Sequence, residues 1–262
     1  MITAQQVKEL RDQTGVGMSD CKNALEEANG DMDLAIEILR KKGIAKASKR
    51  ADNATNEGKI KIEVEGNIAY IVAVSSETDF VAKNEVFGGM LDKFLDFLKT
   101  SSSEDEAIKK AEELKSTEYQ LKIGENMRIN ALTKISGDVI AYYLHSNNKV
   151  ASVIVAKPGT DLEKLRQVAM HVTATNPDVL SPEDISAEII AKEKEIQLEL
   201  MKQDPKNANK PTEILEKIID GKMTKFKEEN ALLTQQFVIN PDIKVKDFIG
   251  ADSIVSFKRF SI

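Results

Sequence analysis

The chain has few of the residues on which disulfides, metal sites and many catalytic sites depend. Among its 262 residues are one cysteine, Cys21, and two histidines, His145 and His171. A single cysteine cannot form an internal disulfide, which indicates a reducing compartment. No segment matches G-x-x-x-x-G-K-[ST] or H-E-x-x-H, and no cysteine or histidine pair stands at metal-ligand spacing. We therefore expect no catalytic residue, no metal site and no cofactor.

A basic excess and long apolar runs are also lacking. Acidic side chains outnumber basic ones by 43 to 37, which gives a formal net charge of -6. Nucleic-acid-binding domains usually carry a basic excess or a basic stripe, so no direct nucleic-acid partner is expected. No apolar segment approaches the roughly 20 residues that span a bilayer, and the N-terminus resembles neither a secretory signal nor a transit peptide. We expect a cytoplasmic protein without membrane contact.

Residues 1–45 predict a small module of three helices. Thr3 and Gln6 have the spacing of a capping box, and the expected helices end near Gly15, at Asn29-Gly30 and at Gly43. Cys21 falls on the apolar face of the second helix, where a buried, inert thiol is the usual outcome.

Residues 46–58 are expected to form a linker. They lack a periodic apolar pattern and are rich in charged and small side chains. Their basic side chains are expected to be solvated: Lys46, Lys49 and Arg50.

The remaining chain predicts an α+β fold with two related subdomains, residues 59–137 and 138–262. In the first, a hairpin of strands 59–65 and 68–74 precedes a helix that starts at Thr78, a second helix that ends near Leu114, and a strand at 127–135. The same order of hairpin, helix and later strand returns from residue 138. Its closing strand is expected at 254–260, so both sheets would be antiparallel.

An insertion at about residues 181–229 predicts an antiparallel coiled-coil hairpin. One charged helix is expected to run from Ser181 to Gln203 and a second from Pro211 to Glu228, joined by a loop. A narrow apolar stripe on each helix would form the contact. Its members are Ile185, Ile189, Ile196 and Leu200 on the first helix, and Ile214, Leu215, Ile218 and Met223 on the second.

Five motifs in consistent order carry a resemblance to a known family. They are TDFVAKN (78–84), TGVGMSDCKNALEEANGD (14–31), KIGEN (122–126), AMHV (169–172) and FVINP (237–241). Together they resemble the elongation factor Ts family over essentially the whole chain. The resemblance implies a ubiquitin-associated-like helical module, two core subdomains and an inserted coiled coil. The chain departs in two places: it ends at Ile262 without the C-terminal helical module of some members, and Gln236 stands where proline is frequent.

The resemblance also implies a function. Family members are guanine-nucleotide exchange factors in translation elongation and are not themselves enzymes. They bind elongation factor Tu·GDP and promote GDP release by disturbing the Mg²⁺ and phosphate site, which allows GTP to reload. The implied partner-binding residues are Lys22, Thr78, Asp79, Phe80, Val81, Ile123, Gly124, Asn126, His145, Val238 and Ile239. Thr78 to Val81 would displace the surroundings of Mg²⁺. The oligomeric state stays open between a monomer and a homodimer that forms a heterotetramer with the partner.

The residue pattern alone favours other roles for several of these positions. Phe80 lies seven residues before Phe87, a spacing typical of one buried helical face. Asp79 could simply be a favourable charge at a helix N-terminus. Gly124 could serve a turn, and Val238 and Ile239 could be core strand residues. Lys22 and His145 could be ordinary surface side chains.

Two other functions remain open at this stage. A binding adaptor without exchange activity would account for the helical module but leaves the motif at 78–84 unexplained. An enzyme with an acidic site would need a nucleophile–base pair or a metal cluster, and neither is evident in the sequence.

Overall fold

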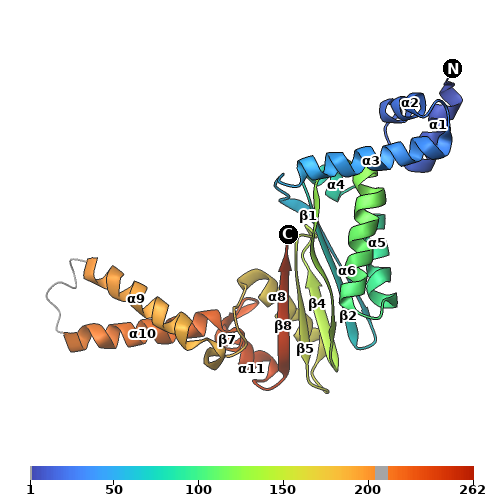
Figure 1. Cartoon of the computed structure of the whole chain (residues 1–262). Coiled ribbons are helices and arrows are strands. Elements are labelled where there is room, and N and C mark those ends of the chain that lie inside the picture. The colour runs from blue at the N-terminus through green and yellow to red at the C-terminus, as the bar shows by residue number, and fades with distance from the viewer. Residues whose placement is uncertain (1, 204–211) are drawn as a thin grey trace. The chain divides into compact units, whose positions relative to one another are not determined.

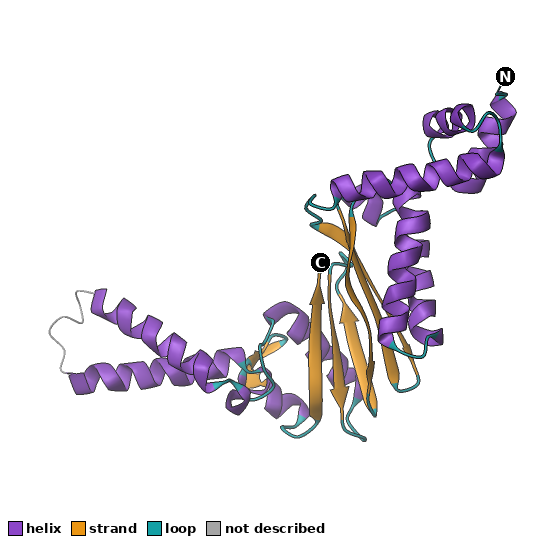
Figure 2. Ribbon diagram, viewed as in Figure 1, coloured by secondary structure: helices purple, strands orange, loops and turns teal. Residues whose placement is uncertain are grey.

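The computed structural model describes residues 2–203 and 212–262 and has mixed helices and antiparallel strands (Figures 1 and 2). This confirms the α+β class. The chain divides into two compact units. Unit 1 comprises Met1–Ser136, Leu144–Ala151 and Phe260–Ile262, and unit 2 comprises Gly137–Tyr143 and Ser152–Arg259.

Unit 1 begins with three helices, α1 (Ala4–Thr14), α2 (Met18–Glu27) and α3 (Met32–Arg50). The capping box at Thr3 and Gln6 is confirmed, since the Gln6 amide donates to Thr3 Oγ1 at 3.2 Å. The helices enclose a small apolar cluster that includes Leu10, Leu25 and Cys21. Burial raises the pKa of the Cys21 thiol, so the group stays protonated and inert.

Gly43 does not end the third helix, so the predicted linker is wrong over residues 46–50. A Cβ at Gly43 would lie only 2.2 Å from Cδ2 of Leu121. The glycine is therefore the point where α3 lies close to α7 (Gln120–Ile123), and α3 continues past it to Arg50. Arg50 is exposed, as expected, and its guanidinium donates to the carbonyl of Gly124.

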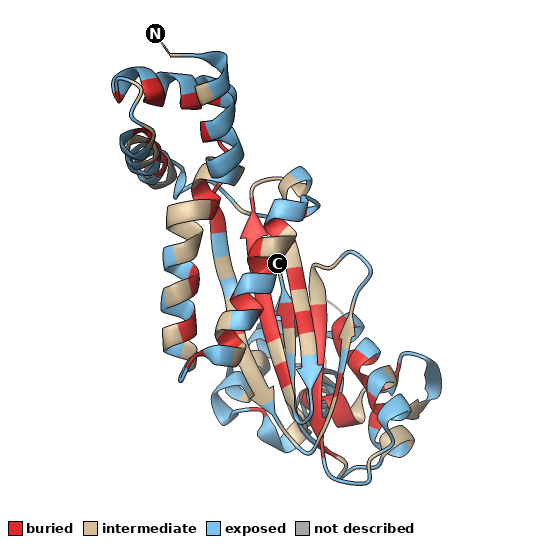
Figure 3. Cartoon of the chain, turned by 90° about the vertical axis from the view of Figure 1, so that its right-hand side faces the viewer, coloured by how far each residue is buried: buried red, intermediate tan, exposed pale blue. Residues whose placement is uncertain are grey.

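The first sheet contains β1 (Glu57–Glu65), β2 (Ile68–Ser76) and β3 (Met127–Ser136) in that order, with antiparallel pairing. Glu65 pairs with Ile68, so the predicted two-residue turn at 66–67 is confirmed. Helices α5 (Glu85–Thr100) and α6 (Glu104–Leu114) pack on this sheet. Figure 3 shows the buried residues along the strands and on one side of these helices. The core cluster contains Val72, Phe87, Met90, Leu91, Phe94 and Leu98.

A π-helical turn at Lys115–Tyr119 continues α6 directly into α7. The sequence pattern did not predict this segment. Its buried Tyr119 joins the core cluster of unit 1.

The second sheet contains β4 (Val139–Leu144), β5 (Val150–Ala156) and β8 (Ile254–Ser261) in that order. The predicted closing strand is therefore confirmed. In unit 2, α8 (Leu162–Thr175) packs with the segment that carries β6 (Gln236–Phe237), β7 (Asn240–Lys244) and α11 (Val245–Ile249). Their shared core includes Val168, Val172, Leu232 and Phe237.

Helices α9 (Ala187–Gln203) and α10 (Thr212–Asn230) lie side by side (Figure 1). The chain approaches α9 through the 3₁₀ turn Pro182–Asp184, which is why the helix starts later than predicted. The predicted contact stripe is wrong for four of its eight members, because Ile189, Ile196, Leu200 and Ile214 are exposed. Three predicted members, Leu215, Ile218 and Met223, do lie in the cluster between the helices, together with Met201 and Ile219. Ile185 is buried but precedes α9. The predicted loop at 204–211 lies outside the described residues, and the coiled-coil geometry stays a prediction.

No helix among the described residues has both the length and the apolar character needed to cross a bilayer.

Candidate functional site

The motif at 78–84 forms a short helix and the start of a second one. Thr78 caps α4 (Asp79–Ala82), with its Oγ1 accepting from the Val81 amide at 3.4 Å. Asn84 then caps α5, because its Oδ1 accepts from the Val86 amide at 2.8 Å. The prediction of one continuous helix from Thr78 through Leu98 is therefore wrong. The break interrupts the helical spacing between Phe80 and Phe87.

Phe80 is 83% exposed, whereas Phe87 is fully buried. The core role that helical spacing favoured for Phe80 is therefore wrong. Beside it, Val81 packs partly against the core of unit 1. Asp79 accepts a hydrogen bond from Lys83 Nζ at 2.6 Å, which lowers the pKa of Asp79 and raises that of Lys83. The motif thus presents an aromatic ring and a charged pair to solvent.

Two glutamates join this motif to the one at 122–126. Glu125 accepts from the Thr78 amide at 2.9 Å and from Thr78 Oγ1 at 2.6 Å. In the opposite direction, Glu77 accepts from the Asn126 amide at 2.6 Å and from Asn53 Nδ2 at 3.0 Å. These crossed hydrogen bonds fix the base on which Phe80 stands. Sequence reasoning missed Glu77 and Glu125, although one directly precedes the first motif and the other lies within the second.

The residues expected at 123–126 have different environments. Ile123 ends α7 and is partly buried against the core of unit 1. Gly124 has φ 75°, a conformation that favours glycine, and caps the same helix. Asn126 is buried, and its Nδ2 donates to the carbonyls of Ala51 and Asn53 at 3.2 and 2.9 Å. Asn126 therefore holds the loop in place from inside.

His145 follows β4 at a tight turn, as predicted, and its ring is exposed. Its amide donates to the Val150 carbonyl at 2.9 Å, and its carbonyl accepts from Asn148 at 2.8 Å. The turn after it borders an open cavity of about 630 Å³ in unit 1, which also reaches Asp79. The lining residues are Glu57, Gly58, Lys59, Asp79, Ala82, Lys83, Ser146, Asn147, Asn148 and Lys149.

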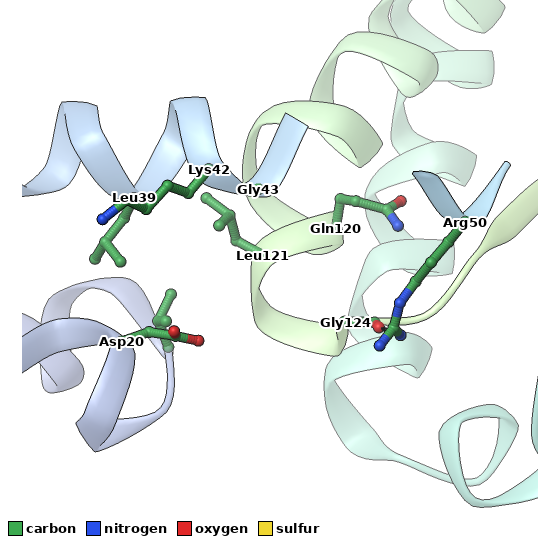
Figure 4. A pocket seen from close by; sticks show the side chains of 9 residues that line it. Asp20, Leu39, Lys42, Gly43, Arg50, Gln120, Leu121 and Gly124 are labelled. Carbon is green, nitrogen blue, oxygen red and sulfur yellow. Dashed lines mark hydrogen bonds between the residues drawn. The ribbon is translucent and has the colours of Figure 1, made fainter. Parts of the chain in front are cut away.

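Lys22 is exposed on α2, with Nζ 3.7 Å from Glu26 Oε1. It borders a mainly apolar cavity of about 350 Å³ together with Ile2, Val7 and Met18. A smaller cavity of about 140 Å³ lies where α3 approaches α7. Figure 4 shows Leu121 beside Gly43 and Arg50 reaching toward Gly124 at this place.

Val238 and Ile239 are exposed in unit 2, with exposed fractions of 48% and 50%. The core-strand role that their pattern favoured is wrong, because they form the turn between β6 and β7. The Val238 amide donates to Nδ1 of the fully buried His171 at 3.1 Å. His171 Nε2 lies 2.8 Å from Gln235 Oε1. The motifs at 169–172 and 237–241 therefore meet through this histidine.

Within residues 2–203 and 212–262, no three His, Cys, Asp or Glu side chains group in a way that could hold a metal ion. Among the described residues, Phe80 in unit 1 is the most exposed large apolar side chain, and Val238 and Ile239 in unit 2 form an adjacent exposed apolar pair. Both segments are held by hydrogen bonds to buried or partly buried side chains. The fold and these features describe an α+β protein with exposed apolar side chains on hydrogen-bonded segments.

Comparison with known proteins identifies the family. A family model described as Elongation factor TS matches residues 77–262. Two proteins named elongation factor Ts, from Klebsiella pneumoniae subsp. pneumoniae and Salmonella newport, are each 43% identical to this chain over 265 aligned residues. Both alignments cover 100% of this chain and 91% of the relative. The chain belongs to the elongation factor Ts family.

Proposed function

We propose that the chain is a guanine-nucleotide exchange factor that binds elongation factor Tu·GDP and accelerates GDP release. The main support is Phe80, an almost fully exposed ring on a base fixed by Thr78 and Glu125. A free protein gains nothing from keeping this ring in water, whereas a partner that buries it gains its apolar area. Membership of the elongation factor Ts family supports elongation factor Tu as that partner.

In the proposed mechanism, Thr78 to Val81 intrude beside the Mg²⁺ site of the partner. Mg²⁺ requires near-ideal octahedral coordination, so a small displacement of its surroundings lowers its affinity. Weaker Mg²⁺ binding loosens the phosphates of GDP. GTP then binds the empty site and displaces the exchange factor. This chain contributes binding and displacement and no reacting group.

Further contacts with the partner are proposed for side chains outside this motif. Lys22, Ile123, Gly124 and His145 would extend the contact in unit 1, and Val238 and Ile239 would add an apolar contact from unit 2. Asn126 is buried, so it would contribute by holding the loop at residues 123–126 in place for the contact. Whether two copies join two partners in a heterotetramer can be measured by light scattering of the purified complex.

Release of fluorescent GDP from elongation factor Tu, followed by stopped flow, tests the proposal. Wild-type protein should accelerate release in proportion to its concentration. The Phe80→Ala variant should lose at least about tenfold of this acceleration, because truncating an aromatic hot-spot residue costs about 2 kcal/mol or more. Its melting temperature should stay unchanged, since the ring contributes almost no burial to the fold.

The matched control is Ile108→Ala, which truncates another exposed apolar side chain in unit 1, on α6. It should leave the acceleration intact. The proposal fails if wild-type protein leaves GDP release unchanged with a partner from the same organism. A Phe80→Ala variant that is destabilised but fully active per folded molecule would instead overturn the role of the ring.

A further inference from the structure

A buried histidine supports the exposed apolar pair of unit 2. His171 lies on α8 and has no exposed surface, and its ring centroid is 5.8 Å from that of Phe237. Its Nδ1 is 3.1 Å from the Val238 amide, immediately before Ile239. The Val238–Ile239 turn is thus attached by its backbone to a residue that contacts no solvent.

The hydrogen bonds define the protonation state of the ring. A backbone amide can only donate, so Nδ1 of His171 must carry a free lone pair. The proton is therefore on Nε2, which donates to Gln235 Oε1 at 2.8 Å. Thr175 Oγ1 lies 3.0 Å from the same oxygen and 2.9 Å from the His171 carbonyl, so its one proton is shared between these two acceptors. A doubly protonated ring would place two donors, Nδ1–H and the Val238 amide, against each other.

We propose that neutral His171 is a positioning residue that orders Val238 and Ile239 for docking on the partner. The inference rests on the proposed function, since the partner is elongation factor Tu. The histidine itself touches no partner atom. It acts by fixing the backbone from which the two apolar side chains project, so that the ordering cost of the turn is met before binding.

The surroundings of His171 favour the neutral ring. Burial lowers the pKa of His171, and the hydrogen bond to Gln235 opposes this shift only in part. Three cations, Lys164 on the same helix and Lys244 and Arg259 on other elements, bond to groups other than the ring. Lys164 Nζ and Arg259 Nε donate to backbone carbonyls at 3.3 and 3.1 Å, and Lys244 pairs with Glu228 at 3.0 Å.

The sign of the pH effect follows from this shift. Releasing the turn exposes the ring to water, so the pKa of His171 moves back toward its ordinary value of about 6.5, and the released state takes up a proton first as the pH falls. The ordered turn is therefore fully favoured above that value. The free-energy difference that favours the ordered turn over the released turn is lost progressively as the pH falls toward the lowered pKa of the buried ring.

Two substitutions of His171 distinguish its hydrogen bond to the Val238 amide from its packing beside Phe237. Asparagine carries an oxygen close to the position of Nδ1 and cannot titrate, so His171→Asn retains an acceptor for the Val238 amide. Phenylalanine retains a ring beside Phe237 but removes the acceptor. Gln235 keeps its hydrogen bond from Thr175 in both variants.

The first measurement is hydrogen exchange of the Val238 amide by NMR, on the full chain without partner. Exchange should be at least about tenfold faster in His171→Phe than in His171→Asn, because only the former leaves the donor without a protein acceptor. Below about pH 6.5, protection should fall in wild type and stay constant in His171→Asn. Equal protection in both variants, or a wild-type profile parallel to that of His171→Asn down to pH 5, would overturn the inference.

The second measurement is binding to elongation factor Tu·GDP at pH 8. His171→Phe should bind about tenfold more weakly than His171→Asn, because the apolar pair is no longer ordered. A purely structural role predicts equal affinity per folded molecule and only a difference in melting temperature. If wild-type protein does not bind or accelerate GDP release, the proposed function fails, while the amide-exchange result still decides whether His171 orders the turn.

Discussion

The segment from which Phe80 projects is fixed by hydrogen bonds of Glu77, Thr78 and Glu125. Glu125 accepts hydrogen bonds from both the amide and the hydroxyl of Thr78. The same hydroxyl accepts a hydrogen bond from the Val81 amide and so caps α4. Hydrogen bonds to an ionised carboxylate are roughly twice as strong as neutral ones. The segment that carries the exposed ring therefore has little freedom to rearrange, which suits the proposed displacement of part of the partner.

Substituting Glu125 should reduce the acceleration of GDP release by more than the loss of folded protein accounts for. Glu125→Ala removes two charge-assisted hydrogen bonds and should lower the free energy of unfolding by about 1–3 kcal/mol. It should also slow GDP release more than it lowers the folded fraction, because Thr78 and Phe80 lose their fixed position. Denaturant unfolding and stopped-flow release on the same samples measure the two effects.

Glu104→Ala is a closely matched control for Glu125→Ala. Glu104 likewise accepts from one hydroxyl, Thr133 Oγ1 at 3.1 Å, and one backbone amide, Lys134 at 2.8 Å. These contacts lie on β3, away from the motif at 78–84. The control should therefore lose similar stability and keep full exchange per folded molecule. Equal losses of exchange in both variants would contradict a positioning role for Glu125.

At the scale of single helices and strands, local patterns predicted the strands better than the helix ends. Alternation along β1 and the two-residue turn after it are local signals, and both were located correctly. The helix break at Asn84 was missed, because an asparagine between Lys83 and Glu85 also fits an exposed helix position. This one residue decides whether Phe80 is exposed or shares the buried face of Phe87.

The course of α3 could not be predicted from its own residues. A glycine after a run of helix formers usually marks a helix end, and Gly43 has that local context. The glycine instead makes room for the close approach of Leu121, which lies far along the chain. The Val238 turn is a similar case, because its acceptor, His171, belongs to another helix. At Gly43 and at Val238, the structure therefore depends on contacts with segments far along the chain, which the local sequence pattern does not contain.

Two helical glycines provide a paired test of this explanation. Gly43→Ala should destabilise the protein by about 1–3 kcal/mol, because the added methyl group overlaps Leu121. Gly88→Ala, in α5, places its methyl group with no atom within 4 Å and should stabilise by about 0.4–1 kcal/mol. Thermal and denaturant unfolding measure both changes. A neutral or stabilising Gly43→Ala would show that α3 and α7 do not pack this closely.

At the scale of the whole molecule, each unit carries its own exposed apolar element and its own internal support. Phe80 depends on Glu125 in unit 1, and Val238 depends on His171 in unit 2. The family resemblance found in the sequence is confirmed by the match over residues 77–262 and by relatives 43% identical to the whole chain. The ubiquitin-associated-like character of the three-helix module, the coiled-coil geometry of α9 and α10, and the partner contacts stay predictions, because neither comparison addresses them.

The proposed exchange reaction couples two binding equilibria, and the coupling must be reciprocal. If this chain weakens GDP binding to elongation factor Tu by about 100-fold, GDP must weaken the binding of this chain by the same factor. Calorimetric titration of the partner with each ligand, in the presence and absence of the other, measures both ratios. Ratios close to one would mean that the two ligands bind independently, which contradicts an exchange mechanism.

The burial of Cys21 leaves the native surface unreactive toward thiol reagents. Its thiol is enclosed in the cluster of α1, α2 and α3, its pKa is raised, and it is the single cysteine of the sequence. A cysteine introduced at an exposed position, such as Ile108→Cys or Val255→Cys, would therefore react with maleimide dyes almost alone. Energy transfer between dyes at these two positions, one in each unit, measures whether the distance between the dyes changes when elongation factor Tu·GDP is added.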